Sequence, residues 1–255
     1  MREHRAQLPD NARALQAVEP RARLAHLFAG GLFALECGAE VGGAAPDELL
    51  ESCEVQDPGG EKPEEQEDAV IQNLGLPLFV KPCGNGSSFG ISRVNGREEL
   101  AAAIELAGSA GQRVLVEECI EGTEITVGVY GEDDVRALPI VEIRKPEDRE
   151  FYDLDVKYVD PTDIHRIPAQ ISPENYARAQ ELACAAHKAL GCLGISRSDF
   201  IVSEDGPVIL ETNTIPGMTD TSLYPDEIRH TDDMTFPQVC DSLIRMGLRR
   251  AGVAC

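Results

Sequence analysis

The chain has 255 residues, of which 42% are hydrophobic, so it is long enough for one large domain or two small ones with a core of their own. Its 45 Asp and Glu against 23 Lys and Arg give a formal charge of −22. Such a surface repels nucleic acid and anionic membranes, and we expect neither as a partner, whereas a few clustered basic residues holding a small phosphate ligand stay compatible with it.

The cysteines and the apolar runs indicate a cytoplasmic protein. None of the 8 cysteines stands in a CxxC pair, so neither zinc-site spacing nor a short disulfide framework is visible. No apolar run approaches the length of a membrane span. The run at Leu27–Leu35 has the length of a signal-peptide core, but its leader is unusually long and carries no clear AxA-type cleavage site.

The first 68 residues are expected to form an irregular or disordered region that contributes little to the core. Their last part, Glu51–Asp68, is rich in acidic residues and contains Pro58, Gly59 and Gly60, a composition typical of a linker. Ordered structure is predicted to begin at Ala69, which divides the chain into a region at 1–68 and a domain at 69–255.

From Ala69 onward, periodicity and turn residues predict helices and strands in alternation. Residues 151–167 and 214–225 are expected to be loops. Ser172, Pro173 and Gly191 mark the two ends of one helix, on which Leu190 is expected to be buried, and Ile244 is expected to face inward on the last helix. The predicted strands are 78–81, 91–94, 114–116, 124–130, 137–143, 200–202 and 208–210, and the predicted helices end at Gly75 or span 98–107, 173–190 and 237–249. Strands and helices mixed with hairpins indicate an α+β or a mixed α/β domain.

The stretch from Arg197 to Asn213 is predicted to be a hairpin that carries charged side chains on one face. A three-residue loop closed by Ser203 and Pro207 would place Asp199 opposite Glu211 and Arg197 opposite Asn213. Ile201 and Ile209 would continue that face, while Val208 would lie on the other. Two facing carboxylates need a cation between them, and their oxygens suit Mg²⁺. An exposed hairpin with solvated charges is the alternative.

Three further features suit a nucleotide. The small residues of Gly84–Gly90 lie between two strands and let backbone amides approach a phosphate, although glycine-rich turns are common. Lys81 on the preceding strand and Lys157 are candidate phosphate partners, although a lysine taken singly is more often only a surface residue. The strand end at Glu117 and Glu118 can pair an adenine edge, with Glu124 on ribose hydroxyls, or these charges only solvate the strand end.

Taken together, these segments resemble the ATP-grasp superfamily and, within it, the D-alanine–D-alanine ligases. The matching residues run in the family's order over roughly two-thirds of the chain. They are LPLFVKPCGNGSSFGIS (76–92), VLVEECIEGTEIT (114–126), EFYDLDVKY (150–158), IPA (167–169) and GISRSDFIVSEDGPVILETNTIPGMTDTSLYP (194–225).

The resemblance implies a role for each matched residue. On the nucleotide side, ATP would be held by Lys81, Lys157, Ser87, Ser88, Glu117, Glu118, Ile120 and Glu124. The hairpin residues Asp199, Glu211 and Asn213 would bind two Mg²⁺ ions, with Mn²⁺ as a substitute. Arg197 and the Gly217 amide would stabilise the tetrahedral intermediate, with Ser87 and Tyr158 also in the catalytic set, and Ser222 with Leu223 would grip the carboxylate of the second D-alanine.

The implied reaction joins two D-alanines through an acyl phosphate, as a step of peptidoglycan precursor synthesis, with D-alanine and ATP as partners and a homodimer allowed. The family also carries an N-terminal α/β domain and a further lysine-bearing segment, and no counterpart of either is found before Lys81. A non-catalytic ATP-binding module completed by another chain is therefore the alternative function. An ATP-grasp ligase for a different carboxylate is a third, against which 214–225 and Tyr158 argue.

Overall fold

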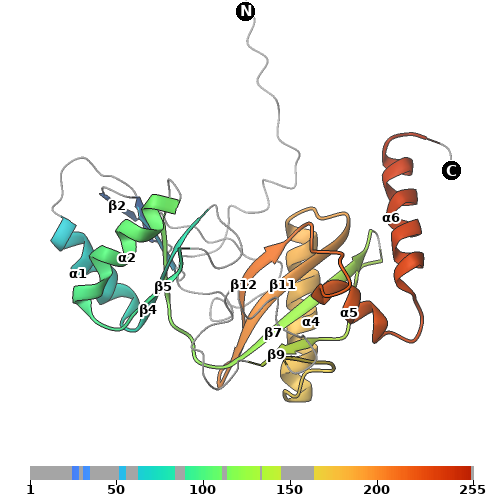
Figure 1. Ribbon diagram of the computed structural model, residues 1–255, viewed down its shortest axis with the longest axis horizontal. Coiled ribbons are helices and arrows are strands. Elements are labelled where there is room, and N and C mark those ends of the chain that lie inside the picture. The colour runs from blue at the N-terminus through green and yellow to red at the C-terminus, as the bar shows by residue number, and fades with distance from the viewer. Residues whose placement is uncertain are drawn as a thin grey trace, which may run out of the picture.

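The computed structural model describes residues 63–83, 90–110, 114–132, 134–144 and 164–253, together with the backbone of three short strands at 25–28, 31–34 and 52–55. The strands among these residues form two sheets, called A and B below (Figure 1). Sheet A has the order β1-β2-β3-β6-β4-β5 and consists of Ala25–Phe28, Gly31–Ala34, Ser52–Val55, Val114–Glu118, Leu78–Pro82 and Ser92–Val94. Its pairings are antiparallel apart from β1 with β3.

Sheet B is antiparallel throughout and holds the predicted hairpin at one edge. Its order is β10-β9-β7-β11-β12, with β8 also paired to β7. In that order the strands are His165–Arg166, Val141–Ile143, Thr123–Gly131, Gly194–Ser203 and Gly206–Asn213, and β8 is Arg136–Ala137. The mixture of helices and antiparallel sheets confirms the predicted α+β class.

Helices α1 (Pro63–Leu74) and α2 (Arg97–Ala110) pack on one face of sheet A. Strand β4 alternates between buried and half-buried residues, so Leu78 and Val80 point at the helices while Lys81 lies on the opposite face. Lys81 therefore lies on the face of sheet A that is turned away from α1 and α2.

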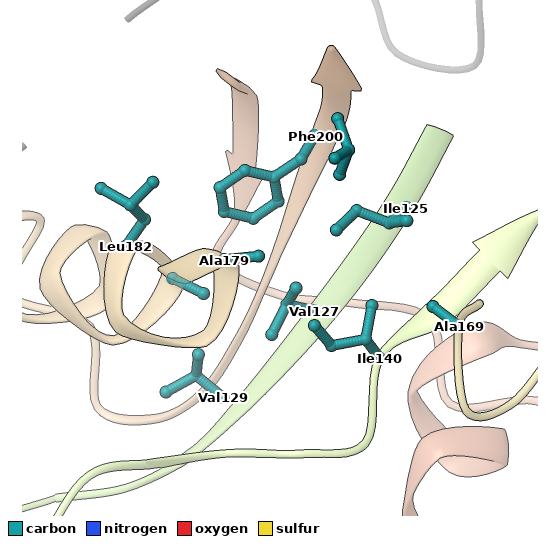
Figure 2. Packing of buried hydrophobic residues seen from close by; sticks show 10 residues of the cluster. Ile125, Val127, Val129, Ile140, Ala169, Ala179, Leu182 and Phe200 are labelled. Carbon is teal, nitrogen blue, oxygen red and sulfur yellow. The ribbon is translucent and has the colours of Figure 1, made fainter. Parts of the chain in front are cut away.

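Helix α4 (Pro173–Ala189) covers one face of sheet B (Figure 2). Ser172 caps its first turn by accepting a hydrogen bond from the Asn175 amide, and Gly191 follows the helix with a φ of 65°, as the sequence predicted. Its apolar side meets Val127 and Phe200, which are fully buried between the helix and the sheet.

Helices α5 (Leu223–Arg229) and α6 (Phe236–Arg250) pack at one end of the opposite face of sheet B. Tyr224 and Ile228 of α5 join Leu138 and Val239 in a separate apolar cluster, which also touches Tyr130. Sheet B thus has α4 on one face. On the other face, called the open face below, α5 covers one end and the strand positions of Arg197 and Asp199 lie beside it. No helix among the described residues is both long and apolar enough to cross a membrane.

Several element boundaries differ from the prediction. Regular structure begins before the predicted Ala69, because α1 starts at Pro63 and β3 pairs with β6, while the first described residue of the core is Val70. Helix α2 continues through Gly108 to Ala110, since Gly108 does not take the positive φ of a helix end. The predicted strand 137–143 is broken between β8 and β9, and a helix begins at Leu223 inside the predicted loop.

Two expected core residues are exposed. Leu190 is 59% exposed because it is the C-cap of α4 and lies beyond the last turn that faces the sheet. Ile244 is 63% exposed because α6 is buried through Val239 and Met246, seven residues apart on one side of the helix.

The hairpin has the predicted register at its open end and a different one at its turn. Arg197 pairs with Asn213 and Asp199 with Glu211, but a β-bulge follows and Ser203 pairs with Gly206 around a two-residue loop. The predicted three-residue loop was therefore wrong. Beyond the bulge the faces of the second strand are exchanged: Ile209 packs in the core beside α4, while Val208 is opposite Ile201.

Candidate functional site

The open face of sheet B carries an arginine and an aspartate locked together. Arg197 and Asp199 are two residues apart on β11 and therefore share a face. The Arg197 Nε and Nη2 atoms donate to the two carboxylate oxygens of Asp199 at 3.0 and 2.9 Å. The hydroxyl of Thr126, directly opposite on β7, also donates to Asp199 Oδ1. These three donors fix the Asp199 carboxylate and orient the guanidinium.

The electrostatics keep Arg197 charged. Burial favours the neutral form, yet the carboxylates of Asp199, Glu227 and Glu211 outweigh it and raise the pKa of Arg197 above its ordinary value. Arg197 is thus a cation bound to Asp199, one of the facing carboxylates of the hairpin, and under the electrostatic influence of Glu211, the other. A guanidinium has five N–H groups, so those not bound to Asp199 remain for a ligand.

Glu211 and Asn213 continue the same face on β12. Glu211 is exposed, and its charge is one of the influences that raise the pKa of Glu117 on sheet A. Asn213 accepts a hydrogen bond from the Ile215 amide at 3.0 Å through its side-chain oxygen, which fixes the direction of that oxygen. The three predicted metal ligands therefore lie on adjacent positions of one face.

The oxygen atoms of Asp199, Glu211 and Asn213 suit a hard divalent cation only if a bound ligand supplies further oxygen atoms. Two carboxylates and one amide oxygen are the oxygen donors that Mg²⁺ takes, usually together with phosphate oxygens and water. Within the described ranges, no group of three or more His, Cys, Asp or Glu side chains is arranged to hold a metal ion by itself. Because Asp199 already accepts three hydrogen bonds, little of its carboxylate is left for a cation. The residues fit a metal that arrives with a nucleotide.

Sheet A contributes a buried ion pair. Lys81 Nζ lies 2.8 Å from Glu117 Oε1, a diagonal contact between β4 and β6 on the face away from α1 and α2. Burial raises the pKa of Glu117, although the nearby Lys81 ammonium works in the opposite direction. This pair sets the position of the Lys81 ammonium, which is the feature that a phosphate contact requires.

A pocket of about 350 Å³ opens on sheet B beside the Arg197–Asp199 pair. Besides that pair it is lined by the predicted residues Glu124, Gly217, Ser222 and Leu223, and by Ile125, Thr126, Ile143, His165, Thr219 and Thr221. Within this wall the hydroxyl of Ser222 accepts from the Thr219 amide at 3.1 Å. A side chain at position 217 would lie 2.8 Å from the same hydroxyl, so a glycine there lets backbone and Ser222 approach each other.

The remaining predicted residues are only partly placed. Glu118 and Ile120 are half-buried at and just after the end of β6. Between them, the Cys119 amide donates to Pro77 O at 3.1 Å and so is already engaged within sheet A. The predictions for Ser87, Ser88, Lys157 and Tyr158 lie outside the described residues.

Three residues of the site were missed from the sequence. Thr126 was read only as part of a strand, but the alternation of β7 with β11 would have placed its hydroxyl opposite Asp199. His165 came from a predicted loop, and burial lowers its pKa, so it is neutral at pH 7 despite the opposing influence of Asp226. Glu227 has no motif to mark it and is fully buried.

Known proteins of one family are similar to this chain. A family model described as D-ala D-ala ligase C-terminus matches residues 55–245. A D-alanine–D-alanine ligase of Syntrophobacter fumaroxidans is 46% identical over 181 residues, or 71% of this chain and 58% of the relative. Among solved structures, the VanG D-Ala:D-Ser ligase from Enterococcus faecalis aligns with a TM-score of 0.62 at 36% identity, over 78% of this chain and 57% of that one. The D-alanine–D-alanine ligase from Bacillus anthracis complexed with ATP has a TM-score of 0.62 at 26% identity, over 82% and 62%.

These likenesses first define the class: two sheets with flanking helices make an ATP-grasp ligase fold. The family model covers most of the chain, so the protein belongs to the D-alanine–D-alanine ligase family. The matched region corresponds to the C-terminus of the ligases in that family. The chain spans 58% of the length of the relatives in the first two matches.

Proposed function

We propose that this chain binds ATP with Mg²⁺ between sheets A and B and joins two D-alanines through an acyl phosphate. The observation that carries the proposal is the juxtaposition of the Arg197–Asp199 pair with Glu211 and with the pocket wall at Gly217 and Ser222. An oriented cation, oxygen donors for a metal and a hydroxyl-lined pocket are the parts that carboxylate activation by ATP needs.

On the nucleotide side, Lys81 would contact a phosphate, and its ion pair with Glu117 supports this role because it holds the ammonium in place. Glu118 and Ile120 are assigned to the adenine, together with Glu117, and Glu124 to the ribose. Lys157, Ser87 and Ser88 are proposed as further phosphate contacts. The ATP-bound relative supports the nucleotide itself.

Asp199, Glu211 and Asn213 would hold the metal. When bound, Mg²⁺, or Mn²⁺ in its place, supplies charge that neutralises the transferring phosphoryl group. The protein's own contribution is to fix two of these three side chains. Arg197 and Thr126 restrain Asp199, and the Ile215 amide restrains Asn213.

The pocket beside Arg197 supports the assignment of the residues that contact the two D-alanines. Phosphoryl transfer to the carboxylate of the first D-alanine gives an acyl phosphate and ADP, and the amine of the second D-alanine then attacks and releases phosphate. Negative charge grows on the carbonyl oxygen during the attack, and the N–H groups of Arg197 and the amide of Gly217 are assigned to stabilise it. Ser222 and Leu223 would bind the carboxylate of the second D-alanine, and Ser87 and Tyr158 would complete the catalytic set. We place this reaction in the cytoplasm with small-molecule partners only, and a homodimer stays a prediction.

A non-catalytic ATP-binding module completed by another chain is the second candidate, and the three hydrogen bonds that Asp199 already accepts favour it, because they leave little of its carboxylate for a catalytic cation. Calorimetric titration with Mg²⁺ and a non-hydrolysable ATP analogue measures nucleotide binding alone. A coupled assay of ADP release, with and without D-alanine, measures the reaction. The ligase predicts ADP release that depends on D-alanine. Nucleotide binding without such release would favour the module, and absence of nucleotide binding would contradict both.

A further inference from the structure

Strand β7 has a gap in its hydrogen bonding where β8 ends and β9 has not begun. Its residues 129 and 130 pair with β8 and its residues 125 and 126 pair with β9. At the gap, the Gly128 carbonyl accepts from the Leu138 amide at 2.7 Å. The Gly128 amide instead donates to the side chain of Glu227, at 2.7 Å from Oε1, across 99 residues of sequence. A carboxyl group on α5 thus supplies a bond that a neighbouring strand would otherwise make.

The carboxyl group of Glu227 also occupies the place of a side chain. Gly128 is directly opposite Arg197 in the β7–β11 register, so both belong to the open face of sheet B. A Cβ atom at position 128 would overlap Glu227 Oε2. Glycine at this position therefore leaves room for the Glu227 carboxyl group beside Arg197, and a side chain there would force that carboxyl group to shift.

Tyr224 makes a second attachment on the next residue of β7. Its hydroxyl donates to the Val129 carbonyl at 2.8 Å. Tyr224 and Glu227 are three residues apart in α5, so they lie on the same side of the helix, and both side chains are fully buried. Helix α5 is therefore fastened to consecutive residues of β7 by two hydrogen bonds, both out of contact with solvent.

What these bonds hold is the pocket wall. Ser222 is the N-cap of α5 and Leu223 its first residue, and both line the pocket that Arg197 and Asp199 also line. The segment before α5 is connected to the helix by Arg229, which donates to the Asp220 carbonyl at 3.0 Å and to Asp226. A shift of α5 relative to β7 would therefore move the residues 217–223 relative to Arg197.

We propose that Glu227 is a positioning residue, which sets residues 217–223 at the correct distance from Arg197 by fastening α5 to the Gly128 amide. The proposal rests on the proposed function insofar as these residues bind the acceptor D-alanine. Burial raises the pKa of Glu227, and the groups that face it are the Gly128 amide, Arg197 and Asp199 from the sheet and Asp226 from its own helix. The role requires only an acceptor at Oε1, so a neutral side chain of the same shape should fulfil it.

Variants at position 227 distinguish the effect of the hydrogen-bond acceptor at Oε1 from the effect of the carboxylate charge. Glu227→Gln keeps an acceptor oxygen, whereas Glu227→Leu leaves the buried Gly128 amide without a partner. Tyr224→Phe removes the second attachment with little change in volume. Tyr176→Phe is the matched control, because the Tyr176 hydroxyl accepts from the Ile140 amide at 2.8 Å in the same gap but from α4 on the other face.

Hydrogen–deuterium exchange of residues 217–223 is the first measurement, and it needs no turnover. We expect Glu227→Leu to speed exchange there about tenfold, equivalent to the roughly 1.4 kcal/mol of one lost buried hydrogen bond. Tyr224→Phe should act in the same direction. Glu227→Gln should exchange as the natural chain does, and Tyr176→Phe should leave 217–223 unaffected. Unchanged exchange in both Glu227→Leu and Tyr224→Phe, or an equal increase in Glu227→Gln and Glu227→Leu, would overturn the proposal.

The second measurement is the KM for D-alanine in the ADP-release assay, with calorimetric titration of the ATP analogue alongside. Glu227→Leu should raise the KM about tenfold while the affinity for the nucleotide stays within about twofold. Loss of nucleotide affinity together with D-alanine use would contradict a role confined to residues 217–223. If the natural chain releases no ADP with D-alanine, the proposed function fails, and the exchange measurement still decides the role of Glu227.

Discussion

Replacing Lys81 with methionine tests how much the ion pair between Lys81 and Glu117 contributes to the free energy of unfolding. The side chains of Lys81 and Glu117 are 20% and 9% exposed, and their charges are 2.8 Å apart. Removing one partner of a buried pair strands the other charge, typically at a cost of about 3–5 kcal/mol. The partial exposure of Lys81 places the expected loss at the lower end, about 3 kcal/mol at neutral pH.

The loss should depend on pH with a definite sign. Burial already raises the pKa of Glu117, and Lys81 is the influence that lowers it, so Lys81→Met must raise that pKa further. A raised carboxyl pKa means that the folded chain binds the proton more tightly than the unfolded chain. The destabilisation is therefore fully present above the raised pKa and disappears as the pH falls towards the ordinary value of 4.5.

Urea unfolding followed by circular dichroism at about pH 7.5 and about pH 5.5 measures both effects. Lys188→Met is the matched control, because Lys188 is exposed on α4 and the change in charge is the same. The double variant Lys81→Met with Glu117→Gln should recover about 2 kcal/mol relative to Lys81→Met alone. An equal loss at both pH values, or a loss in Lys81→Met no larger than in Lys188→Met, would refute the reasoning.

The other predictions concern the core and the metal ligands. Phe200→Ala should lower the free energy of unfolding by about 3–5 kcal/mol, because the ring is fully buried against α4, whereas Ile201→Ala on the other face should cost less; urea unfolding compares the two. Glu211→Gln should abolish Mg²⁺-dependent ATP turnover with the fold retained, because an oxygen donor for the metal loses its charge, and Asp199→Asn should do so too. ADP release at saturating Mg²⁺ measures this effect, and turnover at the rate of the natural chain would remove both residues from the metal site.

The predicted hairpin face was correct for its charged half because alternation and register were enough to place it. Arg197, Asp199 and Glu211 are adjacent as expected. The half near the turn was wrong, since a bulge is decided by how both strands fit their neighbours. Ser203 pairs with Gly206, and Ile209 accordingly turns to the core.

Contacts across long sequence distances could not be predicted from local pattern. The first three residues of α5 were assigned to the polar loop 214–225, and the helix was missed because it has only seven residues and begins beside Thr219 and Thr221. Glu227 is buried through its bond to Gly128, and no periodicity indicates such a partner. The start of α1 was placed too late because acidic residues 64–68 resemble a linker, while the structure pairs Asp68 with Arg97 of α2.

Direct detection of D-alanyl-D-alanine tests the central claim most directly. Purified chain is incubated with ATP, Mg²⁺ and radiolabelled D-alanine, and the dipeptide is separated by chromatography. A ligase predicts dipeptide that requires both ATP and Mg²⁺ and that is lost in Asp199→Asn and Arg197→Ala, the two residues that form the locked pair of the site. No dipeptide from a chain that binds the ATP analogue, or dipeptide formed equally well by both variants, would contradict the account.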